Sequence, residues 1–315
     1  MTDIFYILFS IIPLILSSIG TSIGQGLIGK HGLHAMQLQP TSANNIVKFC
    51  IIGSAIVETA ALMGFLMSLL LLSNPAVMLD SYFANFGVAG IAIAVGISGL
   101  CAGIAASFPA IAACKSLARQ PFMQTKILNL MLITQTLIMT PNIFGLIVGF
   151  MIKANLTTTT TFNQAMQLFS GGLSIGLGCV GPSIGLCVFA FAALSAIGIN
   201  KKSYSKIVTF TFISEAVIET PVIFSLIISF MILTQDIASL SPLIGWQFFA
   251  SALCMGLSTL SPGVNSGRTG AAAVTQIGLH LELYPALSKL AMLALAMIDS
   301  FAIYGLLVSI MILIY

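Results

Sequence analysis

The chain has 315 residues, of which 58% are hydrophobic and only 6% are charged, whereas a soluble domain carries about 25% charged residues. This composition excludes a soluble enzyme and predicts an integral membrane protein in contact with membrane lipid. The net charge of +3 is small, and it implies no nucleic-acid partner.

Eight apolar stretches are long enough to cross a bilayer as helices, because about 20 residues span its hydrocarbon core. In chain order they cover residues 5–29, 47–73, 88–114, 127–152, 168–197, 207–233, 245–278 and 286–315. These stretches leave no residues for a soluble domain, so we predict an all-α membrane protein of eight transmembrane helices.

Basic residues fall mainly in the loops after the first, third, fifth and seventh stretches. They are Lys30, Lys48, Lys115, Arg119, Lys126, Lys201, Lys202, Lys206, Arg268 and Lys289. The opposite side holds Lys153 with Asp3, Asp80 and Asp236. Because cytoplasmic loops retain Lys and Arg, the sequence predicts cytoplasmic hairpin loops and both termini outside. Arg268 lies deep within the seventh stretch, from which its long side chain can extend to the cytoplasmic face.

The chain repeats itself four times, at nearly constant intervals, when it is aligned on Glu58. The segment IVETAALMGFLMSLLL corresponds to LIMTPNIFGLIVGFMI, VIETPVIFSLIISFMI and MIDSFAIYGLLVSIMI. Met139, Glu219 and Asp299 therefore occupy the position of Glu58. Each unit is a predicted helical hairpin, and the four hairpins cover residues 1–78, 79–158, 159–238 and 239–315. The second hairpin lacks the carboxylate.

The first helix of each hairpin is rich in small residues, whereas the second is bulkier. Gly172, Gly176 and Gly185 in the third hairpin illustrate the pattern. Small residues allow helix backbones to approach closely in lipid. Two arrangements remain open on this evidence: an inner layer of thin helices within a closed ring, or close packing inside one eight-helix bundle.

With this repeat, the chain resembles four fused copies of the c subunit, the rotor-ring proteolipid of rotary ATP synthases and ATPases. The loop LARQP, from Leu117 to Pro121, is similar to the F-type loop, and MQLQP is a divergent version of it. The separation along the chain between Pro40 and Glu58 equals that between Pro121 and Met139. The family has the same separation between its loop proline and its carboxylate. The last helix, MIDSFAIYGLLVSIMILIY, is similar to the second helix of the family.

The resemblance implies a non-catalytic, ion-translocating subunit of an F-type complex, in a prokaryotic inner membrane or a related organelle membrane. Its implied partners are other copies of itself in a closed ring, the a subunit of the stator, and central-stalk subunits at the cytoplasmic loops. It implies no cofactor, and the transported ion is H+ or Na+. A standalone eight-helix ion transporter or channel that uses the same carboxylates is the alternative.

In the family the carboxylate in the middle of the second helix carries the ion, which implies that Glu58, Glu219 and Asp299 are the carriers. Independently of the family, a carboxylate at the centre of a bilayer costs about 2.5–3.5 kcal/mol on insertion scales. A bound proton or cation removes most of that cost. A purely structural acid, held by a hydrogen bond between helices, is the competing interpretation.

Further ligands follow from the sodium-binding members of the family. They carry a glutamine on the first helix at a fixed distance along the chain before the carboxylate. Gln25 stands at that distance before Glu58, while Ala106, Leu186 and Ser266 occupy the place in the other hairpins. They also carry a hydroxyl directly after the carboxylate position, and this chain has Thr59, Thr140, Thr220 and Ser300 there. Such hydroxyls also bond back to their own helix, so a Na+ site at the carboxylates stays one of two interpretations.

Val217 and Glu215, which both precede Glu219, add oxygen atoms to its surroundings. The family's sodium sites use the backbone carbonyl at the position of Val217 as a ligand. Pro221 has no N–H to donate to this carbonyl, so the carbonyl lacks its usual helical hydrogen bond. A helix kink is the alternative reason for that proline. Glu215 lies one helical turn before Glu219. It either replaces the missing amide or acts as a protonated partner of Glu219.

Met139 cannot carry a charge, which makes the second hairpin a silent copy. The functional interpretation is a changed number of ions per ATP, and the alternative is drift in a degenerate repeat. In the family each ion site is shared between neighbouring hairpins. We therefore expect Thr140 to serve as a ligand for the carboxylate of hairpin 1 or hairpin 3.

Overall fold

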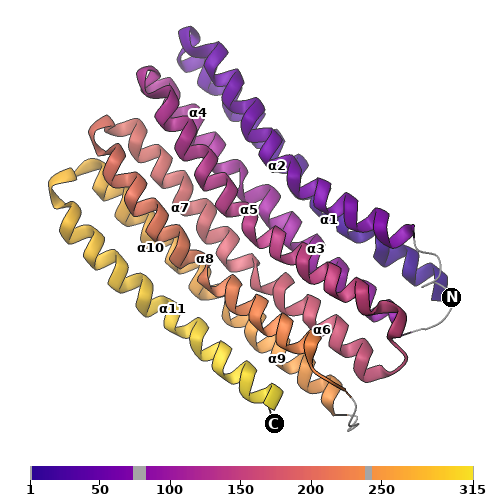
Figure 1. The fold of residues 1–315 in the computed structure, drawn as a ribbon. Helices are drawn as coiled ribbons and strands as arrows, with labels where there is room; N and C mark the ends of the chain where they lie inside the picture. Colours follow the sequence, from indigo (N-terminus) through magenta and orange to yellow (C-terminus); the bar gives the residue numbers. More distant parts are fainter. Residues whose placement is uncertain (1, 74–82, 238–242, 315) are drawn as a thin grey trace.

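The computed structural model describes residues 2–73, 83–237 and 243–314, which form four helical hairpins side by side in chain order (Figure 1). Hairpin 1 consists of α1 (Thr2–Leu38) and α2 (Ala43–Leu72), and hairpin 2 of α3 (Ala84–Ala105), α4 (Ser107–Arg119) and α5 (Gln124–Asn155). Hairpin 3 consists of α6 (Phe162–Gly178), α7 (Val180–Ile199) and α8 (Tyr204–Thr234). Hairpin 4 consists of α9 (Ile244–Ser258), α10 (Leu260–Leu279) and α11 (Tyr284–Ile314).

Short 3-10 helices turn the chain at the end of the molecule opposite to its termini (Figure 1). They are η1 (Pro40–Ser42), η3 (Pro121–Met123), η5 (Lys201–Ser203) and η6 (Leu281–Leu283), while η4 (Leu156–Thr158) links hairpins 2 and 3. The first two begin with proline, whose fixed φ and missing N–H suit the first turn of a helix. Asp80 and the predicted boundaries at 78/79 and 238/239 lie outside the described residues.

The first arms of hairpins 2, 3 and 4 are each interrupted once, at Ala106, Cys179 and Thr259. A proline follows every interruption by three residues, at positions 109, 182 and 262. Proline has no N–H and its ring clashes with the carbonyl four residues earlier. This explains why two helices, rather than one, form each of these arms.

The arms form two layers. The first arms pack on one another in the order α1, α3, α6, α9, with α4, α7 and α10 continuing that layer, whereas α2, α5, α8 and α11 form the second layer. A Cβ atom added at Gly24 would overlap the backbone of Gly103, and one added at Gly185 would overlap Gly263. These glycines therefore permit the close approach of neighbouring first arms that the small residues predicted.

The row of hairpins has two edges, because hairpin 1 packs against hairpin 2 and hairpin 4 against hairpin 3. Large apolar side chains are exposed at both edges, such as Ile19 and Ile51 on hairpin 1 and Met297 and Phe301 on hairpin 4.

Among the described residues, seven arms are long and apolar enough to cross a membrane, where the sequence predicted eight spans. The remaining arm, α9 with α10, includes Arg268, which is exposed, and it packs along α6 and α7 as part of hairpin 4. The prediction of an all-α membrane protein built from four hairpins is confirmed.

Candidate functional site

Glu219 lies where hairpin 3 meets hairpin 2. It is 8% exposed, and its carboxyl lies beside the Thr140 side chain of hairpin 2, close enough for the two groups to interact. An ionised carboxylate would be costly in these apolar surroundings unless it were paired or hydrogen-bonded. The contact with Thr140 places one carrier candidate in a seam between two hairpins.

Asp299 is the second buried carrier candidate, at 7% exposed on α11. The hydroxyl of Ser266 on α10 donates a hydrogen bond of 3.2 Å to Asp299 Oδ1. By sequence, Ser266 stands at the place of the amide that Gln25 provides in hairpin 1, and its contact with Asp299 is not predicted. The signal was present, because Ser266 stands before Asp299 at the same separation as Gln25 before Glu58.

Glu58 differs from the other two, because its side chain is exposed on α2. Glu219 contacts the preceding hairpin, whereas Glu58 lies on hairpin 1, the first of the hairpins that the structure describes. Gln25, on the same hairpin, donates its Nε2 hydrogen to the Ser54 carbonyl at 3.3 Å. The structure thus places Gln25 against the backbone of α2.

Three of the four hydroxyls at the position after the carboxylate bond back to their own helices. Thr59 donates to the Ile56 carbonyl at 2.7 Å, Thr220 to Ala216 at 3.0 Å and Ser300 to Met297 at 2.7 Å. This is the alternative that the sequence left open for threonine. Thr140 stands apart through its contact with Glu219.

Pro221 and Glu215 both lie within α8, which continues through the proline. Because Pro221 cannot donate, the carbonyl of Val217 lacks its usual helical partner. Glu215 is fully buried, and neither of its carboxyl oxygens has a hydrogen-bond partner among the described atoms.

Gln135 is the counterpart of Glu215 in hairpin 2. Its Nε2 donates to the carbonyl of Gly53 at 3.2 Å and to that of Ala106 at 2.8 Å, so its amide joins hairpins 1 and 2. Met139, one turn further along α5, is 4% exposed. Hairpin 2 therefore presents a neutral amide and a thioether where hairpin 3 presents two carboxyls.

Comparison with known proteins shows the repeat directly. The model of the ATP synthase C subunit family matches residues 8–71, 89–152, 169–232 and 249–312. The ATP synthase c subunit of Chloroflexus aurantiacus is 36% identical over 69 residues, covering 22% of this chain and 91% of that protein. The c subunit of Dehalococcoides mccartyi is 38% identical over 70 residues, covering 22% and 92%.

A longer relative matches several hairpins at once. The A-type ATP synthase K subunit of Methanocaldococcus jannaschii is 27% identical over 226 residues, covering 72% of this chain and 94% of that protein.

The fold and the seams define a membrane proteolipid made of repeated hairpins, with acidic groups in the middle of its second arms. The four matched segments cover more than half of the chain, so the chain belongs to the ATP synthase C subunit family. It is a non-catalytic, integral membrane rotor component of an ATP synthase.

Proposed function

We propose that Glu58, Glu219 and Asp299 carry the ion that the rotor moves across a prokaryotic inner membrane. The observation that supports this most is the Glu219 site, where a buried carboxyl in one hairpin meets the Thr140 hydroxyl of the preceding hairpin. Asp299 repeats the arrangement of a buried carboxyl with a hydroxyl partner. The matches of the family model favour this function over a standalone transporter or channel.

The ring closes when hairpin 4 of one copy packs against hairpin 1 of another. Within the chain Gly185 packs on Gly263, and the repeat places Asn265 and Ser22 at the corresponding positions of the two edges. Both residues are exposed. A groove of about 510 Å3, lined by Ser261, Asn265 and Phe301 among others, lies on the free edge of hairpin 4. It provides a concave surface for the second copy.

Ring closure also completes the Glu58 site. In the seam between hairpins 2 and 3, Thr140 lies one position after the carrier position of its own hairpin and contacts the carboxyl of the next. By the same repeat, Ser300 of hairpin 4 meets Glu58 of the neighbouring copy. The exposure of Glu58 in one chain is thus the expected state of an incomplete site.

Hairpin 2 can offer two oxygen atoms to the Glu219 site, and both suit Na+. They are the Thr140 hydroxyl beside the carboxyl and the Leu137 carbonyl, which Pro141 leaves without its helical donor. Val217 and Thr220 offer the same two groups to the next seam, towards Asp299. Hard cations prefer oxygen ligands, so Na+ competes with protons for these carboxyls.

In the working rotor, each site holds its ion while it faces lipid and releases it at the a subunit of the stator. A bound ion is needed in lipid because a bare carboxylate is costly there. The hairpin loops face the cytoplasm, where their basic residues meet the central stalk, and both termini lie outside.

We expect Na+ to protect the carriers from dicyclohexylcarbodiimide at neutral pH. The reagent reacts with a protonated carboxyl in an apolar site, so a bound Na+ removes its target. Labelling of Glu58, Glu219 and Asp299 in the purified ring should slow when NaCl is added and stay unchanged with KCl. Peptide mapping measures each site. Labelling that follows pH but ignores Na+ would show that the rotor carries protons alone.

We also expect Thr140→Ala to weaken ion binding at Glu219 specifically. The substitution removes the hydroxyl that contacts this carboxyl, and a hydrogen bond to a charged group contributes about 1.5–3 kcal/mol. Na+ protection of Glu219 should therefore require at least about tenfold more salt, while protection of Asp299 and Glu58 stays as in the wild type.

Thr136→Ala is the matched control. Thr136 lies one turn earlier on α5, is exposed, and bonds only to the carbonyls of Leu132 and Ile133 in its own helix. It should leave all three sites unchanged. Equal protection of Glu219 in the Thr140→Ala ring and in the wild type would refute the shared site.

A further inference from the structure

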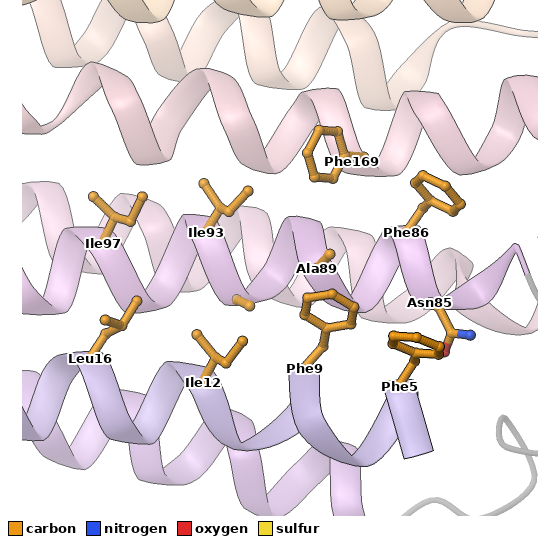
Figure 2. A pocket seen from close by; sticks show the side chains of 11 residues that line it. Phe5, Phe9, Ile12, Leu16, Asn85, Phe86, Ala89, Ile93, Ile97 and Phe169 are labelled. Carbon is orange, nitrogen blue, oxygen red and sulfur yellow. The ribbon is translucent and has the colours of Figure 1, made fainter. Parts of the chain in front are cut away.

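A groove of about 390 Å3 runs along the layer of first arms, between α1 and α3, near the end of the molecule that holds the termini (Figures 1 and 2). Figure 2 shows Phe9 and Leu16 of α1 on one side, Asn85 and Ile97 of α3 on the other, and Phe169 of α6 beyond them. The lining is almost entirely apolar apart from Asn85.

A small residue in hairpin 2 makes room for the groove. Ala89 lines it, and the repeat places Leu8, Phe169 and Phe249 at the same position of the other three hairpins. The family-model matches begin at these four residues, so their equivalence does not depend on the placement of a gap. The groove is therefore a local feature of this chain and not a property of every hairpin.

Asn85 places a polar side chain in the groove, and its Nδ2 has no hydrogen-bond partner there. Its side chain is 8% exposed, and its Nδ2 has no hydrogen-bond partner among the described atoms. A buried donor left unpaired costs about 1–3 kcal/mol. The equivalent residues are Ile4, Ala165 and Gly245, so the amide is also particular to this seam. An acceptor that is not part of the chain would remove the penalty.

The depth of Asn85 in the membrane follows from Trp246 of hairpin 4, which the repeat places at the position of Phe86, directly after Asn85. Trp246 packs on Phe249, which stacks on Phe169, a residue that lines the groove. Aromatic residues, tryptophan above all, gather at the level of the lipid headgroups. From Phe5 to Leu16 the groove then descends about 16 Å along α1, at about 1.5 Å per residue. Its polar end thus lies near the headgroups and its apolar end near the hydrocarbon centre.

We propose that this groove binds one acyl chain of a membrane glycerolipid, whose ester carbonyl accepts a hydrogen bond from Asn85 Nδ2. The polarity of the groove matches such a lipid from end to end: an acceptor at the interface, followed by hydrocarbon. Because α1 and α3 belong to the same chain, every copy contains the complete site, whatever the number of copies in the ring.

The test uses the purified ring in vesicles of dioleoyl phosphatidylcholine that contain a small fraction of phosphatidylcholine with a diazirine in its acyl chain. After illumination, peptide mapping should find label on the α1 and α3 residues that line the apolar end of the groove. Ala89→Phe introduces the residue that hairpins 3 and 4 have at this position, and its ring fills the groove. It should lower this label at least about tenfold, since the space for buried hydrocarbon is gone.

Two further variants separate the parts of the proposal. Asn85→Ile, which copies hairpin 1, removes the donor and should lower the label about two- to tenfold, the usual effect of one hydrogen bond. Ile184→Phe adds a ring on an exposed position of α7 outside the groove and should change nothing. Wild-type labelling in Ala89→Phe would overturn the lipid site, as would a polypeptide found cross-linked there instead of lipid. An unaltered label in Asn85→Ile would overturn the role of the amide.

Discussion

Replacing Glu58, Glu219 and Asp299 together by Gln, Gln and Asn should abolish ATP synthesis driven by an ion gradient. An amide neither takes up a proton at neutral pH nor neutralises a cation, so the ring would have no group that carries charge. The same change removes the cost of placing carboxylates in the bilayer, and we therefore expect the ring to assemble normally. Synthesis by the whole complex in liposomes is the measurement, with ring size on a gel as the assembly check.

Asp236→Asn is the control for this experiment. Asp236 is exposed just beyond the end of α8, on the side of the molecule opposite to the hairpin loops, and its loss should leave synthesis unchanged. Gradient-driven synthesis that survived the triple substitution would show that another group carries the ion. Glu215 would then be the first to examine, because it is the remaining carboxyl that lies fully buried among the described residues.

Met139→Glu should raise the number of ions moved per ATP by one third, because three carriers among four hairpins would become four. The surroundings favour a working site. Met139 is buried at the carrier position, and by the repeat it faces Thr59 of hairpin 1, as Glu219 faces Thr140. The measurement is the ion gradient that just balances a fixed ATP/ADP ratio in liposomes. That gradient should fall to about three quarters of its wild-type value, because the product of ions per ATP and free energy per ion is constant at balance.

Met139→Gln is the control that changes the shape of the side chain without adding an ionisable carboxyl. It has nearly the size of glutamate but carries no ion, so the balance point should stay at the wild-type value. The contrary outcome is a Met139→Glu ring that assembles and is labelled by the carbodiimide while the balancing ion gradient stays at its wild-type value. That result would show that hairpin 2 does not carry an ion past the stator as the other hairpins do.

Most of the architecture follows from regular spacing in the sequence. The return of Glu58 as Glu219 and Asp299, at whole multiples of one nearly constant interval, predicts hairpins of equal length with their acidic groups at one depth. Helical rise per residue is constant, so equal spacing in sequence becomes equal depth in the membrane. The interruption of the first arms at Ala106, Cys179 and Thr259 was not predicted, although a proline after each was visible.

The contacts between neighbouring hairpins are visible only in the tertiary structure. The sequence does not say which neighbouring carboxyl lies beside Thr140, and in the fold it is that of Glu219. It also gave Ser266 no role, and the fold aims its hydroxyl at Asp299. The sequence by itself determined the repeat, the hairpins and the position of the carboxylates, because these depend on local helix geometry. The partners of each carboxylate depend on how neighbouring helices rotate and slide against one another, which is decided by contacts between residues far apart in the chain, such as Gly185 on Gly263.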